Sequence, residues 1–347
     1  MKYKVGMYGG SFDPLHIGHI HDIIKASSIC EELYVIISWC DGRESTSKEL
    51  RYRWILNSTR HLPNVKIILI EDKAVSKEEY NTNYYWEKGA KDIKNAIGKP
   101  IDVVFCGDDY YGTNRFESLY CPESKVIYFE RKEVPISSTE IREWASNHWD
   151  YIPNVCKSYY TRKVLVVGGE STGKSTLVQN LALAYNTNFV SEVGRDTCAY
   201  AGGEKYMTVD DLYENLLKQR INVDEAAKSS NRILFVDTDA LTTKFYVNFL
   251  LDETSPHAKL CNELALAIHN INKWDLVLFL EPTVDFVQDG TRSEEIASDR
   301  EKYSNQIKAL LQENGVRYIC LDGDYLDRFV KAKSIIKNQL NIDTTWQ

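Results

Sequence analysis

The chain has 347 residues, of which 43% are hydrophobic and 27% are charged. This composition is globular and excludes a disordered or collagen-like chain, and the length suits two domains rather than one core. The net charge is −8, and neither half has a basic excess. These charges argue against a nucleic-acid binder, so we expect no DNA partner.

Eight cysteines stand singly in the sequence, from Cys30 to Cys320, and none forms a C-x-x-C pair. A disulfide framework or a zinc site would show clustered spacing, so we expect reduced thiols. The start, MKYKVGMYGGS, has no apolar signal segment, and the longest apolar runs are too short for a membrane span. We therefore expect a soluble, cytoplasmic protein with no membrane partner.

Five short apolar runs in the first part of the chain predict β-strands. They lie at residues 3–9, 33–38, 65–70, 102–107 and 125–129. Longer segments with polar and apolar residues at helical spacing separate such runs. Strands that alternate with helices predict a parallel sheet covered on both faces.

The first predicted strand leads into the segment GGSFDPLHIGH, and a helix is predicted from about residue 18 to residue 26. Glycines let a backbone approach its ligand closely, and a helix N-terminus favours phosphate. His16 and His19 are three residues apart, so one helical turn can present both. We predict a nucleotide site with these two histidines as catalytic residues. The other predicted contacts to the nucleotide in this segment are Gly9, Gly10, Ser11 and Phe12.

This segment resembles the H-x-G-H signature of the nucleotidyltransferase superfamily. The second signature of that family, I-S-S-T-x-I-R, is present from Ile136 to Arg142. The resemblance implies that the histidines stabilise the phosphates of ATP and that Arg142 holds the triphosphate. Further nucleotide contacts are expected from Arg131, Ser137, Ser138 and Thr139. Catalysis there would be positioning and charge neutralisation with Mg²⁺, because the attacking phosphate is already an anion.

The substrate side of this first domain carries weaker signals. We favour Trp86, in the stretch YNTNYYWEKG, over its neighbours Tyr84 and Tyr85 as the platform for a flat cationic ring. Arg51 and Arg53 lie on a predicted helix, and one of them is expected to meet a mononucleotide phosphate. We assign Arg53 to this role, and a surface role fits it equally well.

A glycine and two aspartates follow the fourth predicted strand. Gly107 and Asp109 are predicted to contact the adenosine ribose, although the sequence does not separate Asp109 from Asp108 in this role.

Residues 146–160 contain Pro153 and show no clear periodicity, and a new strand follows them. We place the domain junction there, with a nucleotidyltransferase domain at residues 1–157 and a second domain at residues 158–347. Apolar runs in the second domain predict strands at residues 163–169, 188–192, 233–237, 275–281 and 317–323. The expected fold class is α/β, with two tandem parallel-sheet domains: a Rossmann-like nucleotidyltransferase and then a P-loop kinase.

The segment GGESTGKST satisfies G-x-x-x-x-G-K-[ST], with a predicted strand before it and a helix after it. Its backbone amides would cradle phosphates, Lys174 would reach the outer phosphates as a catalytic residue, and Ser175 would bind Mg²⁺. The predicted nucleotide-binding residues of this loop are Gly168, Glu170, Ser171, Thr172, Gly173, Ser175 and Thr176.

Three acids follow strands of the second domain, where open α/β sheets bind their ligands. Asp237 is predicted to bind the metal ion. Glu192 or Asp239 is predicted to contact the acceptor hydroxyl and to take its proton, and the sequence does not separate the two. Arg195 and Asp196 are assigned to the substrate.

Two arginines lie in the polar stretch DGTRSEEIASDR. Arg292 and Arg300 there resemble the lid arginines of small-molecule kinases, which close on the transferred phosphoryl group. A charged surface helix is the alternative.

The order of the two domains resembles the bifunctional nicotinamide-mononucleotide adenylyltransferase/ribosylnicotinamide kinase (NadR-type) family. Finer matches are R-x-x-x-P-I-S-x-T-x-I-R from Arg131, D-T-D-x-x-T-T from Asp237 and V-x-D-G-x-R from Val287. The resemblance implies that the kinase phosphorylates nicotinamide riboside at its 5′-hydroxyl. The adenylyltransferase would then join the mononucleotide to AMP from ATP, giving NAD and pyrophosphate. The implied partners are these small molecules, and the implied cofactor is Mg²⁺.

Some positions depart from the family pattern. Phe286 stands where a tryptophan is frequent, and Val193 to Asp196 replace a Tyr/Ala-Arg-Glu segment; both changes touch the expected nucleoside pocket. The chain starts at the first predicted strand, so we expect neither the helix-turn-helix domain of some members nor repressor activity. The sequence leaves the oligomeric state open, a homo-oligomer included.

Two other functions compete with this one. A coenzyme A synthase, which fuses phosphopantetheine adenylyltransferase to dephospho-coenzyme A kinase, has the same order of domain types. Its first motif is usually T-x-G-H, whereas this chain has His16 in that place. A non-catalytic nucleotide sensor would not need to keep both histidines and Lys174.

Overall fold

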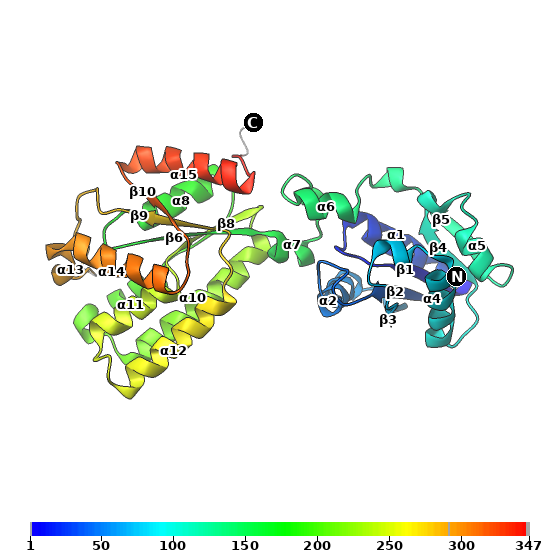
Figure 1. The fold of residues 1–347 in the computed structure, drawn as a ribbon, viewed down its shortest axis with the longest axis horizontal. Coiled ribbons are helices and arrows are strands. Elements are labelled where there is room, and N and C mark those ends of the chain that lie inside the picture. The colour runs from blue at the N-terminus through cyan, green and yellow to red at the C-terminus, as the bar shows by residue number, and fades with distance from the viewer. Residues whose placement is uncertain (1, 291, 345–347) are drawn as a thin grey trace. The chain divides into compact units, whose positions relative to one another are not determined.

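The computed structural model describes residues 2–290 and 292–344 (Figure 1). The chain forms two compact units, Met1–Cys156 and Lys157–Gln347, and each contains one five-stranded sheet. All strand pairs are parallel. The predicted α/β class with two tandem parallel-sheet domains is confirmed. The predicted junction, between residues 157 and 158, lies one residue from this division.

The sheet of unit 1 has the strand order β3-β2-β1-β4-β5. Its strands are β1 (Tyr3–Gly10), β2 (Cys30–Trp39), β3 (Val65–Glu71), β4 (Val103–Gly107) and β5 (Lys125–Phe129). The order changes direction beside β1, which has β2 on one side and β4 on the other. In parallel sheets a ligand crevice forms at the carboxyl ends of strands at such a point.

Unit 1 also contains helices. They are α1 (Ile17–Ile29), α2 (Lys48–Thr59), α3 (Lys77–Tyr80), α4 (Asn83–Ile97), α5 (Arg115–Tyr120) and α6 (Ser138–Trp144). The 3-10 segments are η1 (Asp108–Tyr110), η2 (Arg131–Glu133) and η3 (Trp149–Tyr151). One core joins Met7 and Val104 of the strands to Ala90 of α4 and Phe116 of α5. The junction segment, which lacks sequence periodicity, contains η3 and all of α7 (Asn154–Tyr160), and Pro153 directly precedes that helix.

The sheet of unit 2 has the strand order β10-β9-β6-β8-β7. Its strands are β6 (Arg162–Gly168), β7 (Phe189–Val190), β8 (Ile233–Asp237), β9 (Leu276–Leu280) and β10 (Ile319–Leu321). The buried strands β8 and β9 are apolar on both faces, as expected for a sheet between two helical layers. A strand thus forms within or beside each of the ten predicted segments.

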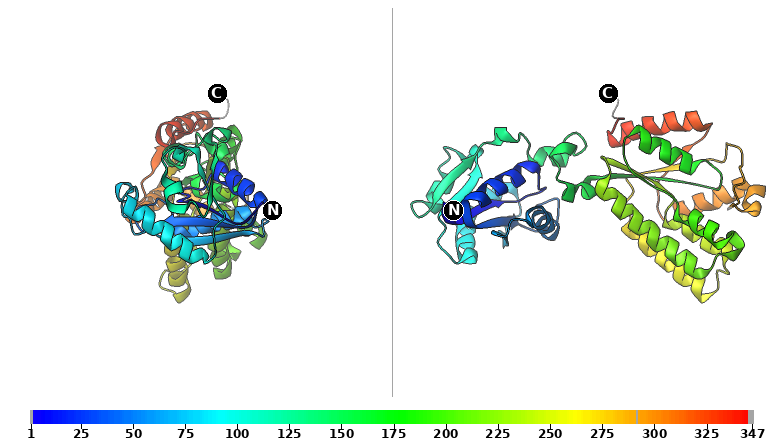
Figure 2. Two further views of the ribbon diagram at one scale, coloured as in Figure 1. Left: turned by 90° about the vertical axis from the view of Figure 1, so that its right-hand side faces the viewer. Right: turned by 180° about the vertical axis from the view of Figure 1, so that it is seen from behind.

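Figures 1 and 2 show two helical layers around the second sheet. The helices of the unit are α8 (Lys174–Ala184), α9 (Val193–Ala201), α10 (Val209–Ser229), α11 (Ala240–Leu250), α12 (Pro256–Ile271), α13 (Glu294–Ser298), α14 (Arg300–Glu313) and α15 (Tyr325–Leu340), with the 3-10 segment η4 (Glu204–Tyr206). One core joins the sheet to α8 and α15, and another joins it to α10, α11 and α14. In the described part of the chain, no helix has the length and apolar character needed to cross a membrane.

Candidate active sites

A cavity of about 620 Å³ lies at the carboxyl ends of the strands in unit 1. It brings together most of the residues that the sequence predicted for the first site. The predicted residues that line it are Gly9, Gly10, Ser11, His16, His19, Trp86, Gly107, Arg131, Ser137, Ser138, Thr139 and Arg142. Segments more than 100 residues apart in the sequence therefore meet at the edge of the sheet.

The two histidines hold each other at the start of α1. The Nδ1 atom of His16 accepts a hydrogen bond from the backbone N–H of His19 at 3.3 Å, and the Nδ1 atom of His19 accepts one from the backbone N–H of His16 at 3.4 Å. The rings are stacked with centroids 3.6 Å apart. Because each Nδ1 atom accepts a hydrogen bond, it carries no proton, and the neutral ring has its proton on Nε2. Each ring can therefore donate from Nε2 to a phosphate oxygen.

Burial keeps these imidazoles neutral. It lowers the pKa of His16 to about 4, and the charge of Arg131 acts in the same direction. Burial and the neighbouring His16 lower the pKa of His19 well below its ordinary value. Neutral donors suit a site that must hold phosphates without binding protons near neutral pH.

Gly18 gives the histidine pair its space. A Cβ atom at this position would lie 3.0 Å from Nδ1 of His16 and 3.1 Å from its Cε1 atom. Any larger residue would push the ring from its stacked position. The glycine of H-x-G-H is thus required by the close approach of His16.

The carboxylate of Asp13 ties the histidine loop to residues 45 and 46. Its oxygens accept hydrogen bonds from the backbone N–H groups of Ser45 and Thr46 at 2.8 and 3.0 Å, and from both hydroxyls. Arg142 reaches the same loop, because its guanidinium donates to the Asp13 carbonyl and, at 2.9 Å, to Thr139 Oγ1. Arg142 is thereby held beside the histidines from the far end of unit 1.

Arg131 and Asp109 form a bidentate ion pair, with Nε–Oδ1 and Nη2–Oδ2 distances of 3.0 Å. Gly107 makes room for it, since a Cβ atom there would lie 2.4 Å from Asp109 Oδ1 and 3.3 Å from Arg131 Nε. Asp109 does not line the cavity, while Arg131 and Gly107 do. The aspartate therefore holds Arg131, and a ribose contact by Asp109 stays a prediction.

The remaining predicted residues of unit 1 differ in their placement. Trp86 lines the cavity and packs against Tyr110 and Phe116, and the guanidinium of Arg115 lies 4.7 Å from its ring centroid. Phe12 is buried against His19 and does not line the cavity. Arg53 is exposed on α2, so the structure does not bring it to the cavity.

The phosphate loop of unit 2 connects β6 to α8. Lys174 is buried, and its Nζ atom lies 3.0 Å from the Gly169 carbonyl. Gly168 and Gly173 have φ angles of +150° and +84°, which residues with a side chain rarely adopt. A Cβ atom at Gly168 would also lie 2.7 Å from the Leu280 carbonyl. Thr172 is also buried, and its hydroxyl donates to the Gly169 carbonyl at 2.9 Å.

Ser175 and Asp237 meet beside this loop. Ser175 Oγ donates to Asp237 Oδ2 at 2.5 Å, and Asp237 is buried at the end of β8. Thr176 follows on α8, where it is exposed. A hydroxyl and a carboxylate at a phosphate loop are the oxygen donors that Mg²⁺ prefers, so the pair fits the predicted metal site.

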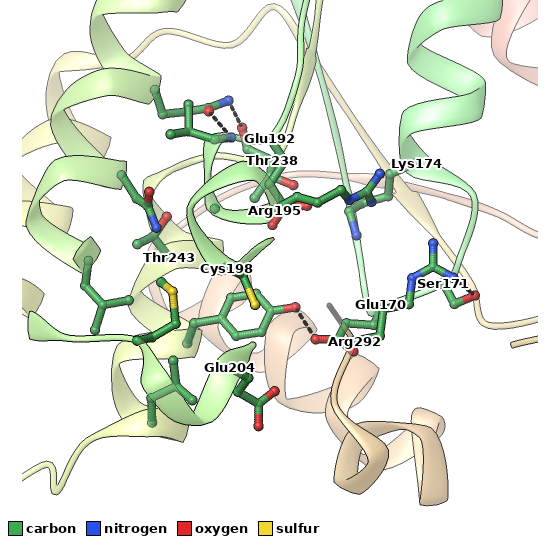
Figure 3. Close-up of a pocket in the computed structure, with 18 residues that line it drawn as sticks. Glu170, Ser171, Lys174, Glu192, Arg195, Cys198, Glu204, Thr238, Thr243 and Arg292 are labelled. Carbon is green, nitrogen blue, oxygen red and sulfur yellow. Dashed lines mark hydrogen bonds between the residues drawn. The ribbon is translucent and has the colours of Figure 1, made fainter. Parts of the chain in front are cut away.

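Glu192 lies close to the phosphate loop and lines a second cavity with Lys174 and Arg195 (Figure 3). Burial raises the pKa of Glu192, the charge of Lys174 opposes that shift, and Asp237 adds to it. A carboxylate with a raised pKa beside a phosphate loop is suited to accept a proton from a hydroxyl. Asp196 is exposed and lies outside the residues that line this cavity.

Asp239, the alternative to Glu192 as the catalytic acid, is the N-cap residue of α11. Its Oδ1 atom caps α11 by accepting hydrogen bonds from the N–H groups of Leu241 and Thr242 at 3.2 and 3.3 Å. Its Oδ2 atom lies 4.0 Å from Nδ1 of His269. The side chain does not line the cavity, because Thr238 has a φ angle of +71° and redirects the chain after β8. The geometry favours Glu192 over Asp239 as the acid near the acceptor.

Both predicted lid arginines contact the phosphate loop through Ser171. Arg292 Nη1 donates to Ser171 Oγ at 2.8 Å, and Arg300 Nη2 donates to the Ser171 carbonyl at 3.2 Å. The two guanidinium groups lie 5.9 and 5.7 Å from the ring centroid of Phe286. Glu170 also connects the phosphate loop to this segment, because its carboxylate accepts a hydrogen bond from the Ser293 N–H at 2.8 Å. These contacts do not fit a free surface helix.

Sequence reasoning missed three residues around these sites. Asp13 lies inside the first motif, yet its partners are 32 and 33 residues away. Tyr246 lines the second cavity and donates to Glu170 at 3.1 Å. Arg328 lies 156 residues from the loop carbonyl to which it donates. The sequence offered a motif only for Asp13.

The fold and the two sites define an enzyme with a nucleotidyltransferase unit and a P-loop kinase unit. Residues 7–144 match the family described as cytidylyltransferase-like, and residues 163–328 match the family described as AAA domain.

Similar proteins cover the whole chain. The trifunctional NAD biosynthesis/regulator protein NadR of Escherichia coli (strain K12) is 28% identical over 98% of this chain and 84% of its own length. That of Salmonella typhimurium (strain LT2) is 28% identical over 97% of this chain and 83% of its own length. Phosphopantetheine adenylyltransferase of Streptococcus pneumoniae (strain 70585) is 37% identical over 84% of its length but covers only 41% of this chain.

Two solved structures share the fold. A NadR protein in complex with NR has a TM-score of 0.82 at 22% identity, and the match covers 100% of this chain and 98% of that one. A NadR protein in complex with NAD and AMP-PNP has the same TM-score and identity, with 99% and 98% covered. The chain is therefore similar to NadR proteins over nearly its whole length, in sequence and in fold.

Proposed function

We propose that this chain is a bifunctional NAD salvage enzyme. Unit 2 transfers the γ-phosphoryl group of ATP to the 5′-hydroxyl of nicotinamide riboside, giving nicotinamide mononucleotide and ADP. Unit 1 joins that mononucleotide to AMP from a second ATP, giving NAD and pyrophosphate. The proposal is supported by two cavities, one in each unit, that are lined by the predicted phosphate-binding residues, in a chain that matches NadR relatives over 98% of its length.

In the kinase reaction, Lys174 and the loop amides hold the phosphate chain of ATP. Glu192 orients the riboside hydroxyl and takes its proton as the phosphorus–oxygen bond forms, since burial raises the pKa of this carboxyl. Arg292 and Arg300 are joined to the loop through Ser171 and hold the transferred group. Arg195 binds the riboside from the same cavity.

Ser175 and Asp237 would hold Mg²⁺ in this unit, because their oxygens lie 2.5 Å apart beside the phosphate loop. Bound there, Mg²⁺ supplies positive charge to the β- and γ-phosphate oxygens.

In the adenylyl transfer, the mononucleotide phosphate attacks the α-phosphorus of ATP and pyrophosphate leaves. His16 and His19 donate from Nε2 to phosphate oxygens, while their Nδ1 atoms stay bonded to the backbone. Arg142 neutralises the leaving pyrophosphate. No proton has to be moved, because nucleophile and leaving group are both anions, so donors that stay neutral suffice.

Trp86 is the proposed contact for the nicotinamide ring. Its ring lines the cavity, and its Nε1 atom is buried without a hydrogen-bond partner among the described residues. That N–H group can donate to the carboxamide oxygen of the ring.

A coenzyme A synthase remains the second candidate, because phosphopantetheine adenylyltransferases are up to 37% identical to the first part of the chain. Those relatives match about 40% of the chain, whereas NadR relatives match nearly all of it. Incubation with Mg-ATP and either nicotinamide riboside or phosphopantetheine, followed by mass detection, separates the two. We expect NAD from the riboside, and dephospho-coenzyme A from phosphopantetheine would overturn the proposal.

A further inference from the structure

A buried arginine from the last helix lies directly against the phosphate loop of unit 2. Arg328 on α15 is 1% exposed. Its Nη1 atom donates to the carbonyl of Thr172 in the loop. Its Nη2 atom donates at 2.7 Å to the Glu281 carbonyl and at 2.7 Å to Thr283 Oγ1, both just after β9. One side chain thus joins α15, the end of β9 and the loop.

The acceptors of Arg328 are all uncharged. In the described part of the chain no carboxylate pairs with its guanidinium, and the acids that act on it from further away, Glu281 and Asp322, are each bonded to a lysine. Burial lowers the pKa of Arg328, and the charge of Arg300 acts in the same direction. A buried cation is costly unless an anion balances it, and carbonyl oxygens do so only in part.

Beside Arg328 and the phosphate loop, the anion that we expect is the phosphate chain of a bound nucleotide. The loop passes close to the arginine at Gly173. A Cβ atom at this glycine would lie 3.6 Å from Arg328 Nη1 and 2.8 Å from Cε1 of Tyr325. The first turn of α15 therefore packs on the residue that precedes Lys174. The loop amides and the guanidinium belong to one rigid group.

We propose that Arg328 is a positioning residue of the kinase site, which fixes the loop through the Thr172 carbonyl and whose buried charge is balanced by the phosphates of the nucleotide. The inference rests on the kinase function proposed for unit 2. It implies that Arg328 affects the affinity for ATP and leaves the affinity for the acceptor unchanged, because its contacts lie on the loop. Arg328 would contribute to ATP binding in two ways. Its hydrogen bonds need the planar guanidinium group, whereas its charge does not.

Three variants test the two contributions. Arg328→Met removes charge and hydrogen bonds, Arg328→Lys keeps the charge, and Thr283→Val removes one acceptor while the arginine stays. The matched control is Lys337→Met, which removes an exposed cation from the same helix where it pairs with Asp343. Riboside phosphorylation is measured at varied ATP and at varied riboside, and thermal unfolding reports the fold.

We expect Arg328→Met to raise the KM for ATP about tenfold, since hydrogen bonds to charged groups have an effect of that order. Arg328→Lys should raise it less and Thr283→Val least, with the KM for riboside within twofold of the parent in all three. A purely structural role predicts that both KM values and the unfolding temperature change together and that lysine is no better than methionine.

An Arg328→Met enzyme with parental KM for ATP would overturn the inference. If that variant does not fold, parental KM values for ATP in both Arg328→Lys and Thr283→Val would overturn it equally. A parent enzyme that does not phosphorylate the riboside would instead contradict the function proposed for unit 2.

Discussion

We propose that both units bind a triphosphate at the end of a parallel strand. The side chains that they use for this differ. In unit 1 the loop after β1 ends in two stacked imidazoles whose pKa values are lowered by burial. In unit 2 the loop after β6 ends in Lys174 and packs against the buried Arg328. The first site combines neutral donors with the charge of Arg142, whereas the loop of the second site has fixed positive charge alone.

The difference follows from the two reactions. The adenylyl transfer has an anionic nucleophile and an anionic leaving group, so its residues need only to position and polarise. Phosphorylation of a hydroxyl also requires a proton acceptor, and Glu192, which lines the same cavity as Lys174, is our proposal for that role. Each substitution should therefore damage one reaction and spare the other.

The largest effect is expected for Lys174→Met. Loss of the ammonium group at the phosphates should reduce riboside phosphorylation on the order of a thousandfold, in line with other phosphoryl-transfer cations. Adenylyl transfer to supplied mononucleotide should stay within twofold of the parent. Lys259→Met, on the exposed face of α12, is the control and should change neither rate.

His19→Ala should lower the turnover of adenylyl transfer by about 10²–10³-fold, which is the usual loss for one donor that stabilises developing charge. The KM for ATP should change far less, and riboside phosphorylation should not change. His61→Ala removes an exposed histidine from the same unit and serves as the control. Normal turnover in His19→Ala would show that the stacked pair is structural.

Glu192→Gln and Asp239→Asn separate the two acids. Removal of a general base typically costs about 10²–10⁴-fold, so Glu192→Gln should slow riboside phosphorylation at saturating substrates by about a hundredfold. Asparagine caps helices as well as aspartate does, so Asp239→Asn should keep the kinase rate within a few fold. The opposite pattern would return the catalytic role to Asp239.

The smallest effect concerns the pH dependence of stability in unit 1. The unfolded chain binds protons on His16 and His19 below about pH 6.5, whereas folded His16 binds one only at about pH 4. Stability should therefore fall as the pH is lowered through this range, by at most about 1.4 kcal/mol per pH unit for each histidine.

Denaturant unfolding of the parent and of His16→Asn, between pH 7 and pH 4.5, measures this slope. Asparagine can still cap α1 but cannot titrate, so the variant should have the flatter profile. Equal slopes would contradict neutral, buried histidines.

The sequence predicted those features that depend on neighbouring residues. Buried parallel strands are continuous apolar runs, and each of the ten predicted runs overlaps a strand. Both phosphate loops were predicted because glycines, histidines and lysine recur at fixed short spacings. The family resemblance added Arg142, which the fold brings to the histidine loop from 129 residues away.

Features that depend on the direction of a side chain could not be predicted from neighbouring residues in the sequence. Asp237 and Asp239 are two residues apart, yet the positive φ angle of Thr238 sends Asp239 to the start of α11. Arg328 has no motif, because its partners come from two separate segments, the phosphate loop and the residues after β9. Arg53 looked equivalent to Arg51 in the sequence, but Arg51 is 2% exposed and bonded to the Ser11 carbonyl, while Arg53 is exposed.

The central claim is that two independent sites act in sequence, and it is tested most directly by mixing two inactive enzymes. Lys174→Met alone and His19→Ala alone should each make almost no NAD from nicotinamide riboside and Mg-ATP. Mixed in one tube, they should restore it, because mononucleotide released by the His19→Ala enzyme diffuses to the intact adenylyltransferase of the other. A mixture that stays inactive, although both variants are folded and each keeps its one predicted activity, would contradict the account.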